Sequence, residues 1–158
     1  MRKNLLTFIG LTDIKTHENK EYNGAVEQIL SKYDFENIYV FITLGLENKI
    51  NELNMIERYK KSSKSNVIAV YTKIDDPTNP RLIYNKLKEH IEEINISTKN
   101  IEGELYVNMV SSTPQIISIL SLLVGGKALY NSIGVYPSNP LYGDRIRLDD
   151  LDFFREII

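Results

Sequence analysis

The chain has 158 residues, of which 42% are hydrophobic and 25% charged, a composition typical of one folded domain rather than of a disordered chain. Its net charge of −2 argues against a protein that binds long nucleic acid by charge alone. The lack of cysteine excludes disulfides and thiolate metal sites, and the two histidines lie far apart in sequence, so we expect neither a metal nor a cofactor.

Nothing in the sequence predicts a targeting or membrane segment. The apolar run near the N-terminus is about five residues long, which is too short for a signal peptide. No apolar run approaches the roughly 20 residues that a membrane span needs. We therefore expect a cytoplasmic protein. No linker, repeat or low-complexity stretch divides the chain, so we expect residues 1–158 to form a single domain.

The first half of the chain alternates between continuous apolar runs, which are typical of strands buried on both faces, and segments with apolar residues at helical spacing. In chain order, this pattern predicts a strand at 5–10, a loop at 14–22, a helix at 24–33, a strand at 38–44, a helix at 47–61 and a strand at 66–72.

The second half continues the alternation. A loop with two prolines spans 73–80. The pattern then predicts a helix at 81–94, a polar loop at 95–103, a strand at 104–110, a helix from Pro114 that Gly125 and Gly126 end, a strand at 128–136, a loop at 138–144 and a short terminal helix or strand at 151–158.

This order predicts an α/β, Rossmann-like fold: a doubly wound, mostly parallel sheet of five to six strands with helices on both faces. In the commonest strand order, strand one lies beside strand four, and ligands bind where the winding reverses between them. The two strand ends carry Gly10-Leu11-Thr12-Asp13 and Val110-Ser111-Ser112-Thr113, which are small and rich in hydroxyls. Such residues let a ligand approach the backbone and offer donors to phosphate or ribose oxygens.

The helix after strand four strengthens this interpretation. Ser112 or Thr113 can cap it, and Pro114 suits its first position. Its free N–H groups and positive dipole end favour an anion such as phosphate. The fingerprints GxGxxG and GxxxxGK[ST] are both absent from the strand ends, which disfavours an ordinary nicotinamide, flavin or P-loop site.

Three motifs resemble the CRISPR-associated Rossmann-fold (CARF) sensors over nearly the whole chain. They are the strand ending in Gly10-Leu11-Thr12-Asp13, the run VNMVSSTPQ from Val107 to Gln115, and the run VYPSNP that begins at Val135. The second is similar to the family's strand-four motif of Asn, then Ser/Thr, then often Gly-Thr-Pro-Gln. Ser112 departs from it, because many members have glycine at this position.

The resemblance implies a homodimer that binds a cyclic oligoadenylate, the second messenger of type III CRISPR antiviral defence, with tetra- or hexa-adenylate held across a two-fold axis. Some members also cleave the ring without metal, by attack of a ribose 2′-hydroxyl on the adjacent phosphate. Other members carry an effector domain after the sensor. This chain ends at Ile158, so it is either a sensor domain cut from a longer protein or a protein that acts alone.

Two alternative functions stay open beside the sensor. One is a stand-alone ring nuclease, although the motif loops contain no obvious general base and no catalytic residue is assigned. The other is a Rossmann-like subunit that binds a different nucleotide or phosphate-bearing metabolite, because fold alone does not identify a ligand.

Candidate ligand-binding residues come from the strand ends. They are Gly10, Leu11, Thr12, Asp13, Lys73, Asn108, Val110, Ser111, Ser112, Thr113, Gln115 and Tyr136. The hydroxyl residues either contact the ligand or only cap and turn the chain. Asp13 would repel phosphate unless it faces ribose or adenine. Lys73 follows strand three on the ligand side, and Tyr136 closes strand five there together with Ser138 and Asn139.

Two further features have competing explanations. His17 is either a surface histidine or a contact over the ligand, where it would act as a lid or proton shuttle. The segment 116–124 is nearly all apolar, so its helix is buried either within its own domain or partly by a second copy of the chain.

Overall fold

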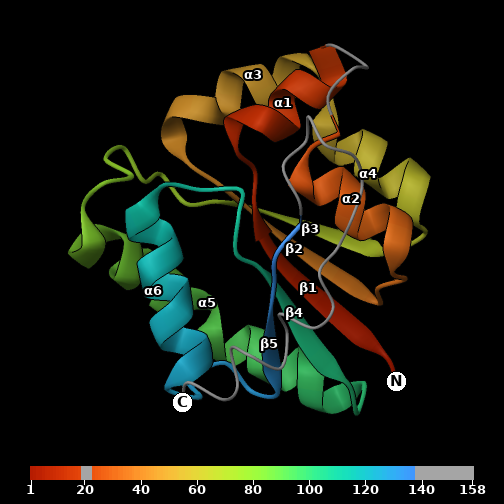
Figure 1. The fold of residues 1–158 in the computed structure, drawn as a ribbon, viewed down its shortest axis with the longest axis vertical. Helices are drawn as coiled ribbons and strands as arrows, with labels where there is room; N and C mark the ends of the chain where they lie inside the picture. The colour runs from red at the N-terminus through yellow and green to blue at the C-terminus, as the bar shows by residue number, and fades with distance from the viewer. Residues whose placement is uncertain (19–22, 138–158) are drawn as a thin grey trace.

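Five parallel strands form the centre of the part of the chain that the computed structural model describes, residues 1–18 and 23–137 (Figure 1). They are β1 (Lys3–Phe8), β2 (Asn37–Ile42), β3 (Asn66–Tyr71), β4 (Glu104–Asn108) and β5 (Ser132–Val135). Their order across the sheet is β3-β2-β1-β4-β5. β1 pairs with both β2 and β4, so the winding reverses between β1 and β4, and the predicted doubly wound fold is confirmed.

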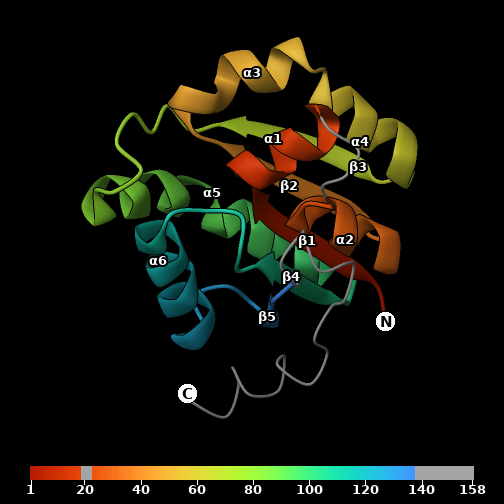
Figure 2. The ribbon, with the colours of Figure 1, turned by 45° about the horizontal axis from the view of Figure 1, so that its top comes forward.

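Helices cover both faces of this sheet. They are α1 (Leu11–Glu18), α2 (Ala25–Lys32), α3 (Glu47–Glu52), α4 (Met55–Ser63), α5 (Pro80–Asn100) and α6 (Pro114–Gly125), with a short 3-10 turn, η1 (Leu44–Leu46). Helices α1 to α4 lie on one face, and α5 and α6 on the other (Figure 1, Figure 2). Neighbouring strand residues point to opposite faces, so Leu5 packs under α1 to α4 and Leu6 under α5 and α6. Burial on both sides explains why the strands are mostly apolar.

The prediction of a loop at 14–22 is wrong for the residues that the structure describes, because helix α1 continues to Glu18. Its fully buried residues are Ile14 and the carboxylate Asp13. A helix whose inward face is half acidic has no hydrophobic period in its sequence, which is why the pattern failed here. Residues 19–22 lie outside the described part of the chain.

Two other predicted helices also differ from the observed ones at positions where polar residues occur. Helix α5 continues through most of the loop predicted at 95–103. Its inward face is completed by the buried Thr98, whose hydroxyl donates to the Ile94 carbonyl at 2.9 Å. The single helix predicted at 47–61 is two helices, α3 and α4, which meet at Asn54. Asn54 has φ 56°, a left-handed conformation that interrupts a helix.

The C-terminal part of the chain is described only to Pro137. Strand β5 spans Ser132–Val135, which is shorter than the strand predicted at 128–136. The loop predicted at 138–144, with Ser138 and Asn139, and the element predicted at 151–158 lie outside the described residues.

Helix α6 begins and ends as its sequence predicts. The Thr113 side chain accepts a hydrogen bond from the Ile116 N–H, Pro114 is the first helical residue, and Gly126 follows the last. One side of α6 packs into the core, whereas Leu122 is 70% exposed. Although α6 is the most apolar helix, none of the helices in the described ranges combines the length and apolar content needed to cross a membrane.

Three asparagines stand in register where β1, β2 and β3 begin. Asn4 lies opposite Asn37, which lies opposite Asn66. The Asn4 side chain is fully buried. Its amide nitrogen donates to the Ser97 hydroxyl at 3.0 Å. Its carbonyl oxygen accepts from the Asn37 backbone N–H at 3.1 Å and from the Asn37 side-chain amide at 3.0 Å. This ladder fixes the strand register and ties the sheet to the C-terminal end of α5.

Replacement of Asn4 by alanine should lower the free energy of unfolding by about 1–2 kcal/mol, because it removes the acceptor of two part-buried Asn37 N–H groups and a donor to the part-buried Ser97 hydroxyl. Urea unfolding followed by circular dichroism measures this change. Asn66→Ala is the matched control, because Asn66 is the exposed end of the same ladder and its loss should change stability by less than about 0.5 kcal/mol. Equal losses in the two variants would contradict the assigned role.

Candidate functional site

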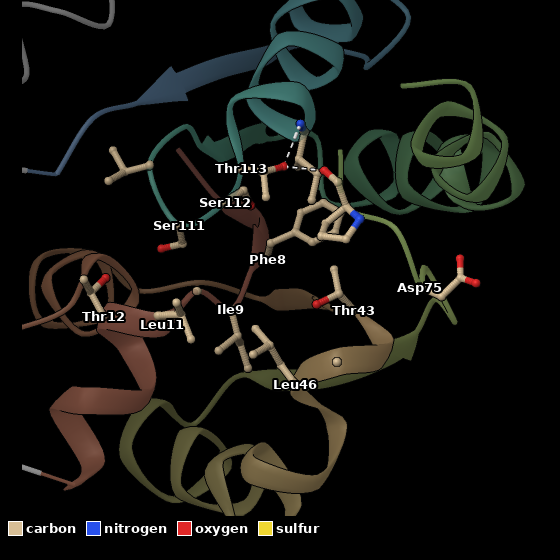
Figure 3. Close-up of a pocket in the computed structure, with 15 residues that line it drawn as sticks. Phe8, Ile9, Leu11, Thr12, Thr43, Leu46, Asp75, Ser111, Ser112 and Thr113 are labelled. Atoms are coloured by element: carbon tan, nitrogen blue, oxygen red, sulfur yellow. Dashed lines mark hydrogen bonds between the residues drawn. The ribbon is translucent and has the colours of Figure 1, made fainter. Parts of the chain in front are cut away.

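The loops that follow β1 and β4 meet at the carboxyl edge of the sheet and border a cavity of about 440 Å³. This volume is in the range of small-molecule sites. Figure 3 shows Leu11 and Thr12 on one side of the cavity and the loop of Ser111, Ser112 and Thr113 on another. The lining residues are Phe8, Ile9, Gly10, Leu11, Thr12, Thr43, Gly45, Leu46, Asp75, Pro77, Val110, Ser111, Ser112, Thr113 and Ile116.

Gly10 in the first loop lies directly against the backbone of Ser111 in the second. A Cβ atom added at Gly10 would lie 2.9 Å from the carbonyl oxygen of Ser111 and 3.0 Å from its carbonyl carbon. Real side chains do not fit at that distance from backbone atoms, so glycine is required here. The predicted convergence of the two strand ends is therefore present in the fold.

Asp13 lies beneath the cavity rather than in its lining. Its side chain is fully buried and accepts hydrogen bonds from the Gly10 N–H at 2.8 Å and from the Val26 N–H at 3.0 Å. It also hydrogen-bonds the Ser111 side chain. Asp13 thus joins the β1 loop, the start of α2 and the β4 loop. Burial raises its pKa above the ordinary value of 3.8, although these hydrogen bonds act in the opposite direction.

The raised pKa of Asp13 predicts a pH dependence of stability. The folded chain favours the protonated carboxyl more than the unfolded chain does, so stability from this group is fully present below pH 3.8 and is lost as the pH rises through the higher folded value. The amide side chain in the variant Asp13→Asn cannot titrate. We therefore expect the unfolding free energy of wild type minus that of Asp13→Asn to fall as the pH is raised from about 4 to about 7. Urea unfolding at a series of pH values measures it, and a difference that is flat or rises with pH would contradict this prediction.

Asn108 is the second buried polar residue that holds the loops. Its amide nitrogen donates to the Thr7 hydroxyl at 3.0 Å and to the Ser111 hydroxyl at 2.8 Å. Its carbonyl oxygen accepts from the Val110 N–H at 3.0 Å. One side chain therefore connects β1 with both ends of the turn after β4. The Ser111 hydroxyl is in turn shared between Asn108 and Asp13, which makes a continuous buried network under the cavity.

Two helix N-termini border the cavity. Helix α1 begins at Leu11, and α6 begins directly after its cap residue Thr113. The Thr113 hydroxyl also donates to the Pro77 carbonyl at 2.6 Å, which ties the β4 loop to the loop after β3. First-turn N–H groups have no acceptor within their own helix, and the helix dipoles point their positive ends here. Both features favour a negatively charged or hydrogen-bond-accepting group in the cavity.

The candidate residues divide into three groups. Those that line the cavity are Gly10, Leu11, Thr12, Val110, Ser111, Ser112 and Thr113. Asp13 and Asn108 support these residues from below. The remaining three, Lys73, Gln115 and Tyr136, are not part of the lining.

The residues outside the lining have other surroundings. The Lys73 ammonium lies 2.7 Å and 3.1 Å from the two carboxylate oxygens of Glu47 at the start of α3. Tyr136 packs against the core under α5 and α6. His17 was expected either on the surface or over the ligand, and it lies in neither place. Its side chain is 8% exposed, its Nδ1 atom lies 3.0 Å from Arg58 Nη1, and its Nε2 atom lies 3.0 Å from Glu27 Oε1.

The pattern missed the part of the cavity that β2 and β3 contribute. Thr43, Gly45 and Leu46 follow β2, and Asp75 and Pro77 follow β3. The strand-end rule that selected the loops after β1 and β4 applies equally to β2, because β2 is the other neighbour of β1. The sequence could not identify the apolar lining residues Phe8, Ile9 and Ile116, because such residues have the same sequence pattern as core residues.

No protein-family model and no curated protein sequence matches the chain. Solved structures match its shape. Csm6 from Enterococcus italicus, bound to cyclic hexa-2′-fluoro-hexa-dAMP, superposes with a TM-score of 0.73 at 17% identity, over 99% of this chain and 39% of that chain. Can2 from Sulfobacillus thermosulfidooxidans, in complex with cyclic tetra-adenylate, superposes with a TM-score of 0.56 at 8% identity, over 87% of this chain and 32% of that chain.

Both are CARF-domain proteins. This chain shares the fold of their matched domains. The fold that the motifs implied is thereby confirmed. At these identities the likeness concerns the fold, and the chain spans less than two fifths of either solved protein.

Proposed function

We propose that this chain is a CARF sensor domain that binds a cyclic oligoadenylate, either cyclic tetra-adenylate or cyclic hexa-adenylate. The observation that carries the proposal is the contact between the loops after β1 and β4, which form a hydroxyl-rich cavity at the point where the winding reverses. Two solved proteins of this fold are bound to cyclic adenylates, which supports the same ligand class here.

The chemistry of the lining supports a role in binding more than one in cleavage. Among the described residues that line the cavity, Asp75 is the one ionisable side chain. Phosphate groups would therefore be held by helix N-termini and hydroxyls, without lysine or arginine from the lining. Of the described lining residues, Asp75 is the one that could take a proton from a ribose 2′-hydroxyl, and its carboxylate points away from the cavity centre in Figure 3. We expect any ring cleavage to be slow.

A homodimer is part of the proposal. Apolar side chains are exposed beside the cavity mouth, where Leu11 is 66% and Val110 38% exposed, and on α6, where Leu122 is 70% exposed. A second copy would cover them. A ring with two-fold symmetry suits two identical half-sites across a two-fold axis. The cavity of one chain would then hold part of the ring.

The test is the thermal unfolding of the chain with each ring. A ring at a hundredfold excess over its dissociation constant stabilises the folded state by about 2.7 kcal/mol, which should raise the melting temperature by about 5–10 °C. Linear tetra- and hexa-adenylate are the matched controls and should give smaller shifts, because their ends are not held together. If neither ring shifts the melting temperature, the proposed function is wrong, and mass spectrometry of ligands retained through purification would identify another metabolite.

A further inference from the structure

Thr43 is a buried residue whose hydroxyl has no partner. It follows β2 and is 8% exposed, and no hydrogen bond to its side chain occurs among the described residues. It precedes the turn η1, yet its hydroxyl does not cap that turn. Figure 3 shows the side chain projecting from the end of β2 into the cavity. The hydroxyl oxygen itself is not one of the fully enclosed polar atoms that lack a partner, so it stays open to the cavity, where a ligand can supply the missing hydrogen bond.

The surroundings of Thr43 differ from those of the other deeply placed hydroxyls. Ser111 is bonded to Asn108, and Thr113 is bonded to Pro77. The rest of the wall near Thr43 is apolar: Phe8 is 1% exposed and Ile9 2% exposed, and Leu46 lies beside Ile9 in Figure 3. The deep part of the cavity is thus an apolar space with one free hydroxyl on its wall.

The lining changes from polar at the mouth of the cavity to apolar in this deep space. The two helix N-termini and the hydroxyls of Thr12 and Ser112 are at the mouth, where Leu11 is 66% exposed. These groups suit phosphate and ribose. The deep space has apolar walls and suits a flat aromatic ring, which packs on side chains such as Phe8.

We propose that the deep space is a purine-base pocket and that the Thr43 hydroxyl binds the Watson–Crick edge of one adenine. This inference rests on the proposed function and assigns the base-reading residue of that same site. The phosphates and sugar stay at the mouth, so the base enters with the edge farthest from its sugar leading. That edge carries the N6 amino group, which can donate to a hydroxyl, and N1, which can accept from one.

The proposal makes opposite predictions for stability and for binding. Thr43→Val removes a hydroxyl that bonds nothing in the fold and replaces it with a methyl group in apolar surroundings. We expect its melting temperature to equal or exceed that of wild type, whereas its affinity for the ring that wild type binds falls about tenfold or more. Thr43→Ser keeps the hydroxyl and should retain most of the affinity.

Thr72→Val is the matched control, because Thr72 is an equally buried threonine at the end of the neighbouring strand. Its hydroxyl donates to the Ile42 carbonyl at 2.8 Å and accepts from the Ile74 N–H at 3.2 Å, and it does not line the cavity. We expect this variant to lose stability and to keep the affinity of wild type for the ring. A residue with a merely structural role at position 43 would behave as Thr72 does.

The experiment is calorimetric titration of wild type and these variants with cyclic tetra-adenylate, cyclic hexa-adenylate and the same rings made with purine riboside, which lacks the 6-amino group. Wild type should bind the adenosine ring more tightly than the purine riboside ring, and Thr43→Val should not distinguish them. If wild type binds a ring and Thr43→Val binds it equally well, the base pocket is wrong and the proposed function stands. If wild type binds neither ring, the proposed function fails and the base pocket fails with it.

Discussion

Replacement of Gly10 by alanine should weaken binding of the cyclic oligoadenylate about tenfold or more and lower the free energy of unfolding by about 1–3 kcal/mol. The added Cβ would lie 2.9 Å from the Ser111 carbonyl oxygen, which belongs to the backbone and cannot rotate away as the end of a flexible side chain can. The two loops would have to separate, which moves the hydroxyls of one loop away from those of the other. Calorimetric titration and urea unfolding measure the two effects.

Gly45→Ala is the matched control for this prediction. Gly45 also lines the cavity, but a Cβ added there would meet no atom within 4 Å. Its stability should therefore stay within about 0.5 kcal/mol of wild type. A Gly10→Ala variant as stable as Gly45→Ala would show that the two loops do not touch as described.

Replacement of Asn108 by alanine should cost about 2–4 kcal/mol of unfolding free energy, the largest loss we expect from a single polar residue. The change leaves the part-buried Val110 N–H without its acceptor and the buried hydroxyls of Thr7 and Ser111 without their donor. It also opens a small void between β1 and β4. Because Ser111 loses an anchor, affinity for the ring should fall as well.

Urea unfolding of Asn108→Ala beside Asn51→Ala separates a lost network from a generic loss of asparagine. Asn51 is exposed on α3, where its side chain accepts one hydrogen bond, from the Tyr71 hydroxyl at 3.2 Å. We expect Asn51→Ala to change stability by less than about 0.5 kcal/mol. A loss below about 1 kcal/mol for Asn108→Ala would contradict the view that its three hydrogen bonds hold the two loops together.

The positions of most strands could be predicted because β1, β2, β4 and β5 are largely buried, whereas the edge strand β3 is only partly buried. A continuous apolar run is then the direct consequence of the fold, as in β1 and β2. The meeting of the loops after β1 and β4 followed from the strand order alone, since parallel strands of a doubly wound sheet bring their carboxyl ends to one edge. The cap at Thr113 could be predicted because it uses only neighbouring residues.

Features that depend on contacts between distant residues could not be predicted. Asp13 looks like a turn residue in sequence, and only the approach of Val26 and Ser111 makes it a buried support. Helix α1 was missed for the same reason, because its inward face includes that carboxylate. Thr43 resembles any polar residue after a strand, and its significance lies in the hydrogen bonds that its neighbours do not offer.

The central claim is that the loops after β1 and β4 together hold the ring. Hydrogen–deuterium exchange of the chain with and without a saturating cyclic oligoadenylate tests it most directly. We predict slower exchange in the segments 10–14 and 110–116, and weaker protection around 43–46. Protection confined to the opposite edge of the sheet, where β1, β2 and β3 begin, or unchanged exchange in both loops of a chain that binds the ring, would contradict the account.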